Sequence, residues 1–368
     1  MPFAERWQIT MNISKMIRIF LDKHPQIDYL QKVIRHSNKN DFRNTVLKLY
    51  KSPDYFEIQS NGSDNPGKII YAIEYTNNMS GFYAVYKTIL EYLFFCDYYG
   101  LIPVIKYPSD WLYSNGEENP FELFFKQPCG IGWEEVQKSR SVVYAKSFHC
   151  VLAHDILGSG TYYQYTENEI KEFGRLRKKY LHYSDEVGKA LKKDIAELFG
   201  TKKILGVHIR GTDYKRAFNG HPTYVNVNDY IDTIHKVIER DYENIFIATD
   251  DQNVLEQIRE EFNTINILTF QSFRSSGDVS VAMIKLERQN HGMLLGYEVI
   301  RDVVALATCA GFIGSLSMVS LAAQVEAVAN NHEFEDKIVL TNGINKNNNH
   351  ISKYEKQLRP LGSDRAPS

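Results

Sequence analysis

The sequence lacks the short motifs that mark the most common nucleotide, metal and hydrolase sites. No GxGxxG follows an apolar run, no GxxxxGK[ST] occurs, and HExxH, EF-hand and GxSxG patterns are missing as well. The four cysteines form no CxxC pair, which argues against a structural zinc site and against a disulfide framework. We therefore expect neither a dinucleotide cofactor nor a bound metal.

An excess of charge of either sign is also lacking. Lys and Arg number 43 and Asp and Glu 45, so the net charge is −2, which gives no general attraction to nucleic acid or to an anionic membrane. Hydrophobic residues make up 43% and aromatic residues 13%, a composition that favours a folded core over disorder. A length of 368 residues predicts two domains.

No secretory signal or membrane anchor is evident. The first 23 residues are amphipathic but interrupted by charges. Residues 303–325 carry no charge and are long enough to cross a bilayer. However, Gly and Ser residues in their middle divide them into a helix end, a buried strand and a helix start. The sequence thus predicts buried core there and a cytoplasmic protein.

The second half of the chain alternates between apolar runs and amphipathic segments. We expect strands at 204–209, 245–249, 265–270, 311–315 and 337–340, and helices at 227–240, 253–262, 297–307 and 318–329. This order is typical of a parallel sheet covered by helices on both faces, which receives ligands at the carboxyl ends of its strands.

The first half is a less regular version of the same pattern. We expect strands at 68–73, 101–105 and 142–145, and helices over much of 1–50 and at 81–96, 167–181 and 185–199. The domains are predicted as 1–200 and 201–342. Residues 343–368 are expected to form a polar tail with a helix that packs back on the first domain.

Two groups of polar residues follow predicted strands. His208, Arg210 and Asp213 lie at the end of the first strand of the second half and in its exit loop, where they can face one crevice. Asp250 and Asp251 end the next strand. Asp251 has an equally good structural interpretation as the N-cap of the following helix.

Two further groups lie later in the chain. Ser315 and Ser317 occupy a strand-to-helix turn, where backbone N–H groups and the helix dipole favour an anion, although ordinary capping explains serines there as well. Asp302 lies on an otherwise apolar helical segment, and a charge in that position needs a partner. The partner of Asp302 can be either a ligand or a basic residue in a structural salt bridge.

Taken together, these segments resemble the donor half of the fucosyltransferase superfamily, which includes α-1,6-, nodulation and protein O-fucosyltransferases. LGVHIRGTDYKRAFNGHP is similar to its HxRRTDK signature with a following HP, IFIATDD to its second signature, and DVVALATCAGFIGSLSMVSLAAQ to its third. The three motifs occur in the right order over about residues 203–328.

The resemblance implies a GT-B fold, in which two Rossmann-like domains with parallel sheets face a central cleft, and a GDP-fucose donor bound without metal. It implies that Arg210 binds the β-phosphate and that Asp302 accepts hydrogen bonds from the guanine edge. The full set of donor-binding residues that it implies is His208, Arg210, Asp250, Asp251, Asp302, Ser315 and Ser317.

The sequence departs from the family pattern at two points. Gly211 stands where the signature has its second Arg, and the loop before His221 lacks the Glu that α-1,6 enzymes have there. The acceptor hydroxyl still needs a proton acceptor, and Asp213 and Glu74 are the candidates.

The sequence therefore predicts an inverting, metal-independent glycosyltransferase that moves L-fucose from GDP-fucose to a hydroxyl of a glycan acceptor. A GT-B transferase that uses another nucleotide sugar is an alternative, because Gly211 alters the phosphate site. A protein that binds a nucleotide sugar or glycan without turnover is a second one.

Overall fold

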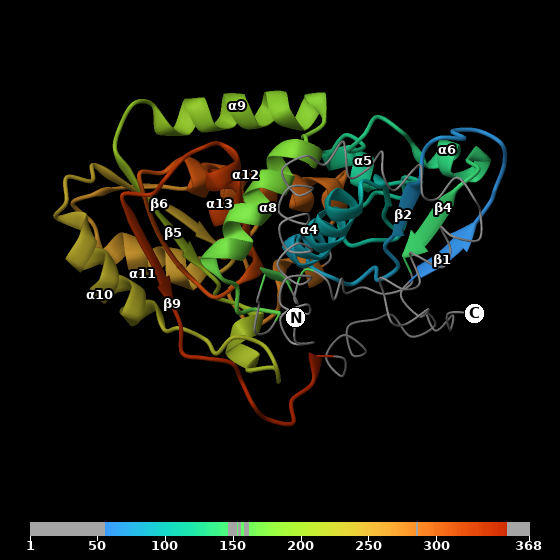
Figure 1. Cartoon of the computed structure of the whole chain (residues 1–368). Coiled ribbons are helices and arrows are strands. Elements are labelled where there is room, and N and C mark those ends of the chain that lie inside the picture. Colours follow the sequence, from blue (N-terminus) through green and yellow to red (C-terminus); the bar gives the residue numbers. More distant parts are fainter. Residues whose placement is uncertain (1–55, 146–152, 154–155, 158–161, 285, 352–368) are drawn as a thin grey trace, which may run out of the picture. The chain divides into compact units, whose positions relative to one another are not determined.

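The computed structural model describes residues 56–145, 153, 156–157, 162–284 and 286–351. The helices expected within residues 1–50 and at the C-terminal end lie outside these ranges. The chain divides into two compact units (Figure 1). The first includes residues 56–75, 88–106 and 127–145, and the second includes residues 76–87, 107–126 and the chain from 156 onward.

The first unit contains a four-stranded sheet with the order β1-β4-β2-β3. Its strands are β1 (Phe56–Gln59), β2 (Ile70–Glu74), β3 (Ile102–Lys106) and β4 (Val142–Ala145). β2 pairs in parallel with both β3 and β4, whereas β1 is antiparallel to β4. Two helices accompany the sheet, α6 (Trp133–Lys138) and the C-terminal part of α4 (Phe82–Tyr99).

The second unit contains a five-stranded parallel sheet with the order β7-β6-β5-β8-β9. Its strands are β5 (Ile204–Ile209), β6 (Asn244–Thr249), β7 (Asn266–Leu268), β8 (Gly311–Ser315) and β9 (Asp336–Leu340). The chain runs outward from β5 to β7 and then returns to the other side of β5. The strand order therefore reverses between β5 and β8, and this is where parallel α/β sheets receive their ligands.

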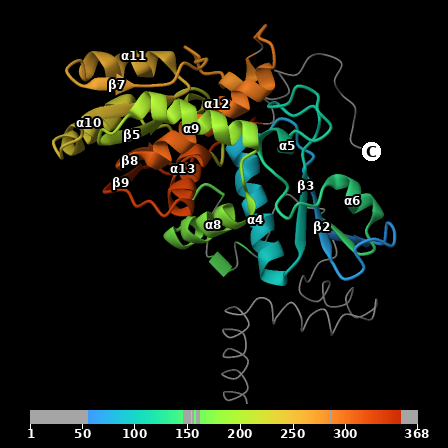
Figure 2. The ribbon, with the colours of Figure 1, turned by 90° about the horizontal axis from the view of Figure 1, so that it is seen from above.

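Helices cover both faces of the five-stranded sheet (Figures 1 and 2). They are α8 (Glu167–Tyr180), α9 (Asp185–Phe199), α10 (Val227–Ile238), α11 (Gln252–Glu261), α12 (His291–Thr308) and α13 (Met318–Ala329). The short helices α5 (Phe121–Phe124), η2 (Asp213–Arg216) and η3 (Val281–Met283) lie in the connecting segments.

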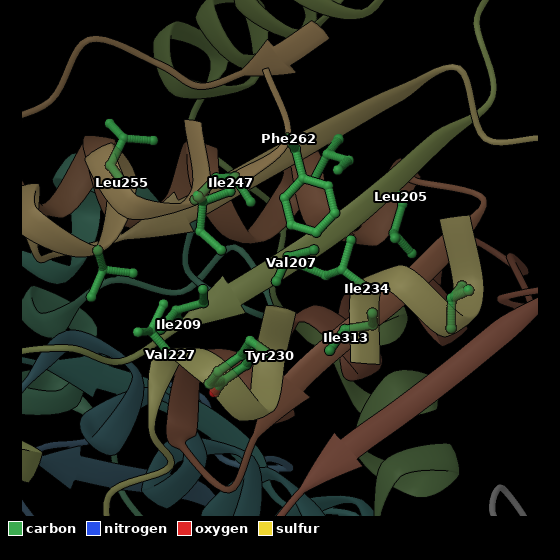
Figure 3. Close-up of a cluster of buried hydrophobic side chains, with 14 of the residues drawn as sticks. Leu205, Val207, Ile209, Val227, Tyr230, Ile234, Ile247, Leu255, Phe262 and Ile313 are labelled. Carbon is green, nitrogen blue, oxygen red and sulfur yellow. The ribbon is translucent and has the colours of Figure 1, made fainter. Parts of the chain in front are cut away.

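Alternate side chains of the central strand β5 point to opposite faces of the five-stranded sheet. Leu205, Val207 and Ile209 of β5 pack with α10 and α11 in a cluster of buried hydrophobic side chains (Figure 3). On the other face, a side chain at Gly206 would collide with Cys309 at the end of α12, and His208 contacts α13. Because both faces are covered, every residue of β5 is buried.

The α/β class with parallel sheets is confirmed, and strands β4, β5 and β8 and helices α9 and α13 have the expected bounds. Residues 303–325 divide as expected into the end of α12, β8 and the start of α13. Within the described residues, no helix is long and apolar enough to span a membrane. β1, α5 and α6 were not anticipated, and α12 begins six residues earlier than expected.

The units differ from the expected division near residue 200. α8 packs on α13 and α9 packs on α12, so both helices belong to the second unit. Residues 343–349 also pair with a loop of the second unit, at Gly220 and Thr223 among other positions. Long-range helix packing of this kind leaves no local signal in the sequence.

A buried ion pair fixes α8 to α13. Arg177 donates to Glu326 through Nε at 2.7 Å and through Nη2 at 2.8 Å, and its guanidinium also lies over the Tyr183 ring at 4.5 Å. The two side chains are only 10% and 4% exposed. Such a pair is sensitive to the loss of one partner, because the remaining charge is buried alone.

We therefore expect Glu326→Ala to lower the free energy of unfolding by about 3–5 kcal/mol in urea titrations. Glu197→Ala removes the exposed i,i+4 pair with Lys193 and serves as the control, with an expected loss below about 1 kcal/mol. Equal stability of the two variants would contradict a structural role for the buried pair.

Candidate functional site

The candidate site lies at the carboxyl ends of β5, β6 and β8, around the point where the strand order reverses. Arg210 is the first residue after β5, and its guanidinium bridges two carboxylates. Nη2 lies 2.6 Å from Asp213 Oδ1, and Nη1 lies 2.6 Å from Asp250 Oδ2. The Arg210 side chain remains 22% exposed, so a ligand can reach it.

Asp250 is held by three groups of the β5 loop. Besides the Arg210 contact, Oδ2 accepts from Thr212 Oγ1 at 2.6 Å and Oδ1 accepts from the Gly211 backbone N–H at 2.9 Å. Burial by itself would raise the pKa of Asp250, but Arg210 and these hydrogen bonds outweigh it and hold the pKa below its usual value. Asp250 is thus a stable anion that fixes the loop.

The charges around Arg210 do not cancel. One guanidinium faces the carboxylates of Asp213 and Asp250, which leaves the cluster with a net charge of −1. A guanidinium has five N–H donors, and the two contacts above leave donors for a further anion. A diphosphate would compete with the carboxylates of Asp213 and Asp250 for the N–H donors of Arg210.

His208 joins the end of β5 to the start of α13. Its Nδ1 lies 2.9 Å from Ser320 Oγ and 3.4 Å from Ser317 Oγ. Burial lowers the pKa of His208 to about 4, a shift that Asp250 opposes and Arg210 reinforces, so the imidazole is neutral near pH 7. His208 therefore holds the N-terminus of α13 at the end of β5 as a neutral hydrogen-bonding group.

The two serines of the β8–α13 turn have structural partners. Ser317 is the N-cap of α13, because its Oγ accepts from the Ser320 backbone N–H at 3.0 Å. The Ser315 hydroxyl is hydrogen-bonded to Tyr230 of α10. The capping interpretation is thus confirmed for Ser317, and what the turn offers an anion is the N–H groups of the helix N-terminus.

Asp251 is also a capping residue. Its Oδ1 accepts from the backbone N–H of Asn253 at 2.9 Å and of Val254 at 3.4 Å, and its Oδ2 contacts Lys215 Nζ. The side chain is fully buried. Both oxygens are therefore engaged within the protein, as the N-cap interpretation predicted.

Asp302 on α12 has no ion pair and no hydrogen bond to its carboxylate within the part of the chain that the structure describes. Its neighbour Arg301 pairs instead with Asp194 of α9, at 2.9 Å. Burial raises the pKa of Asp302 to about 7, although the nearby charges of Arg301 and Arg274 oppose the rise. Within the described residues Asp302 thus forms no salt bridge, and its carboxylate is left available to a ligand.

Glu74 is the exposed last residue of β2 in the first unit, in register with Lys106 of β3. The second unit by contrast brings together His208, Arg210, Thr212, Asp213 and Asp250. Within the described residues no group of His, Cys, Asp and Glu has the arrangement of a metal site.

Sequence reasoning missed three partners of this site. Lys215 neutralises Asp251, Tyr214 lies beside Arg210 with its ring 5.7 Å from the guanidinium, and the hydroxyl of Tyr163 reaches His221. Lys215 and Tyr214 immediately follow Asp213 and belong to η2, so their closeness in sequence was a usable signal. Tyr163 is distant from His221 in the sequence, so no sequence signal indicated this contact.

Residues 173–318 match the family model described as "Alpha-(1,6)-fucosyltransferase N- and catalytic domains". The resemblance to the fucosyltransferases is confirmed. The matched segment runs from α8 to the first residue of α13 and contains Arg210, Asp250 and Asp302. That family is one of glycosyltransferases. No curated protein matches the sequence.

Several solved fucosyltransferase structures are similar to this chain at low sequence identity and low TM-score. NodZ alpha-1,6-fucosyltransferase soaked with GDP-fucose is 15% identical, with a TM-score of 0.42 over 71% of this chain and 92% of that chain. Fucosyltransferase NodZ from Bradyrhizobium is 14% identical, with a TM-score of 0.39 over 71% and 92%. POFUT1 in complex with GDP-fucose is 12% identical, with a TM-score of 0.32 over 48% and 50%.

Close packing against Asp251 explains why Gly211 departs from the fucosyltransferase signature. A Cβ at this position would lie 2.4 Å from Asp251 Cβ and 2.9 Å from its Oδ2. Asp251 cannot withdraw, because it caps α11 and binds Lys215. The space for a second arginine side chain is therefore filled by the Asp251–Lys215 pair.

We expect Gly211→Ala to lower the free energy of unfolding by about 1–3 kcal/mol, the usual cost of forcing extra volume into a packed site. Gly188→Ala is the matched control, because the nearest neighbour of its Cβ is at 3.8 Å within helix α9, and Ala there gains up to about 1 kcal/mol. A Gly211→Ala protein as stable as wild type would contradict the close packing against Asp251.

Proposed function

We propose that the protein is an inverting glycosyltransferase of GT-B architecture that transfers L-fucose from GDP-fucose to a hydroxyl of a glycan, without a metal ion. The family match supports fucosyl transfer. The observation that carries the donor assignment is the partly exposed Arg210, which directly follows β5 at the switch point of the parallel sheet, together with the N-terminus of α13, which His208 of β5 contacts.

The role of Arg210 follows from the chemistry of the leaving group. When the bond from sugar C1 to the diphosphate breaks, negative charge builds on GDP, and a metal-free enzyme must stabilise it with cations or oriented N–H groups. A planar guanidinium binds phosphate oxygens in pairs. The helix N-terminus that His208 holds in place supplies N–H groups to the same anion.

The guanine base is proposed to bind at Asp302. The N1–H and the exocyclic amino group of guanine are adjacent donors that a carboxylate can accept together. Asp302 is partly buried on α12 and makes no internal ion pair among the described residues, so it can serve this purpose. The cytoplasmic location, the absence of a cofactor and the glycan nature of the acceptor belong to the same proposal.

Calorimetric titration with GDP-fucose in EDTA tests this function, with GDP-mannose and UDP-glucose as comparisons. We expect binding of GDP-fucose that is at least about tenfold tighter than binding of the other two.

Arg210→Ala should slow GDP release about a hundredfold or more, because a preorganised charge contact contributes about 3 kcal/mol to the transition state. Arg210→Lys should recover only part of the rate.

No binding of GDP-fucose, or tighter binding of another nucleotide sugar, would contradict the donor assignment. The second result would favour the alternative transferase, since Gly211 removes one phosphate contact. Binding that requires Mg²⁺ or Mn²⁺ would contradict metal independence.

Asp302→Asn separates the binding role from stability. In the folded protein the pKa of Asp302 is raised to about 7, so ionisation opposes folding. The loss of stability develops as pH rises from the unfolded pKa of about 4 to about 7, and it is complete above that. We expect Asp302→Asn to be more stable than wild type at pH 8, by about 1–4 kcal/mol, and equal to it near pH 4.

The same substitution should weaken GDP-fucose binding by about tenfold or more, because hydrogen bonds to a charged group are lost. Wild-type affinity should itself fall below about pH 7, where the carboxyl of Asp302 takes up a proton. The control is Asp278→Asn, which alters an exposed pair with Arg216 and should change neither quantity by much. Unchanged affinity in Asp302→Asn would remove Asp302 from the donor site.

A further inference from the structure

The loop that follows Arg210 is held in place by the C-terminal segment, residues 343–349. Backbone pairing joins the two at Asn219, Gly220 and Thr223, and the Asn345 N–H donates to the His221 carbonyl at 2.8 Å. Asparagine side chains add further contacts. They run from Asn345 to Thr223 and Pro222, from Asn347 to Ala217, and from Asn349 to Arg216. A surface loop with so many backbone contacts has a defined conformation.

This clamped loop presents His221. Its Nδ1 lies 3.3 Å from the Tyr163 hydroxyl oxygen, and its ring is 5.3 Å from the Tyr163 ring. The rings of Phe218 and Tyr214 lie at 5.8 and 6.4 Å. The imidazole is only partly buried, and its Nε2 makes no hydrogen bond within the described ranges.

The position of His221 relates it to the candidate site. Tyr214 neighbours both, with its ring 5.7 Å from the Arg210 guanidinium and 6.4 Å from the His221 ring. The charged groups that act on His221 are Asp213 and Arg210, and the titratable phenols next to it are those of Tyr163 and Tyr214.

The protonation state of His221 suits a proton acceptor. Burial lowers the pKa of His221, Asp213 opposes this shift and Arg210 reinforces it, so the imidazole is neutral at pH 7. Burial also raises the pKa of Tyr163, which keeps that phenol protonated. By contrast, Asp213, one of the two base candidates from the sequence, is ion-paired to Arg210 at 2.6 Å in the free protein.

We propose that His221 is the general base of the transfer, with Nδ1–H held by Tyr163 and Nε2 directed to the acceptor hydroxyl. This inference rests on the proposed function. The acceptor O–H proton moves to Nε2, and the acceptor oxygen forms a bond to C1 of the sugar. The C1–O bond to the diphosphate breaks, and its electron pair leaves with GDP beside Arg210.

The test uses GDP release from GDP-fucose with water as the acceptor, measured at saturating donor from pH 5 to 8. His221→Asn should lower kcat about a hundredfold or more, the usual contribution of a general base, while the calorimetric Kd for GDP-fucose stays within threefold. Wild-type kcat should fall on the acid side as the imidazole is protonated, and this acid limb should be absent in His221→Asn.

Tyr163→Phe tests the positioning role of the phenol. Without the oxygen that accepts from Nδ1–H, the imidazolium is less stabilised, so the acid limb should move to lower pH. His235→Asn is the control, because His235 is exposed and pairs with Glu261 on another face, and its kcat and pH profile should match wild type.

Each outcome decides a separate point. A His221→Asn protein that keeps a wild-type rate, or keeps the acid limb, overturns His221 as the base. Wild-type protein that binds GDP-fucose but releases no GDP overturns it as well, while donor binding stands. Failure to bind GDP-fucose at all overturns the proposed function itself.

Discussion

The arrangement of the site depends on one guanidinium shared by two carboxylates. Arg210 joins Asp213, in the turn after β5, to Asp250, at the end of β6. Thr212 and the Gly211 N–H complete the attachment of Asp250. Neighbouring strands of a parallel sheet are thus joined at the edge where a ligand is received, and the loop between them is fixed before any ligand arrives.

The same contact sets an energetic condition for donor binding. With one cation and two carboxylates the cluster is net negative, so a diphosphate must displace at least one carboxylate from Arg210. Asp250 has two further hydrogen bonds, whereas Asp213 has only a weak one from Thr212 at 3.4 Å. Asp213 is therefore the partner that we expect to yield.

The elements with strong local patterns could be predicted from the sequence. The fully apolar run of β5 and the capped, amphipathic α9 had their bounds predicted correctly. β1 could not be anticipated, because a short edge strand depends on pairing with β4, far along the chain. The sequence predicts a polar loop around Asn345, Asn347 and Asn349. Only the fold shows that their side chains donate hydrogen bonds to the loop that carries His221.

Part of the candidate site could also be predicted from the sequence. Arg210 and Asp250 could be placed together because both follow neighbouring parallel strands. The sequence could not decide between capping and ligand binding for Asp251, since both use the same residue type at the same turn. Packing decides it, because Asp251 fills the space beside Gly211 and pairs with Lys215. The departure from the family signature is thus a consequence of the core.

A crystal structure of the protein with GDP-fucose is the sharpest test of donor binding at Arg210. We expect the diphosphate against Arg210 and the N-terminus of α13, with guanine at Asp302 and the contact between Asp213 and Arg210 lost or lengthened. A nucleotide bound elsewhere, with Arg210 still bridging Asp213 and Asp250, would contradict it.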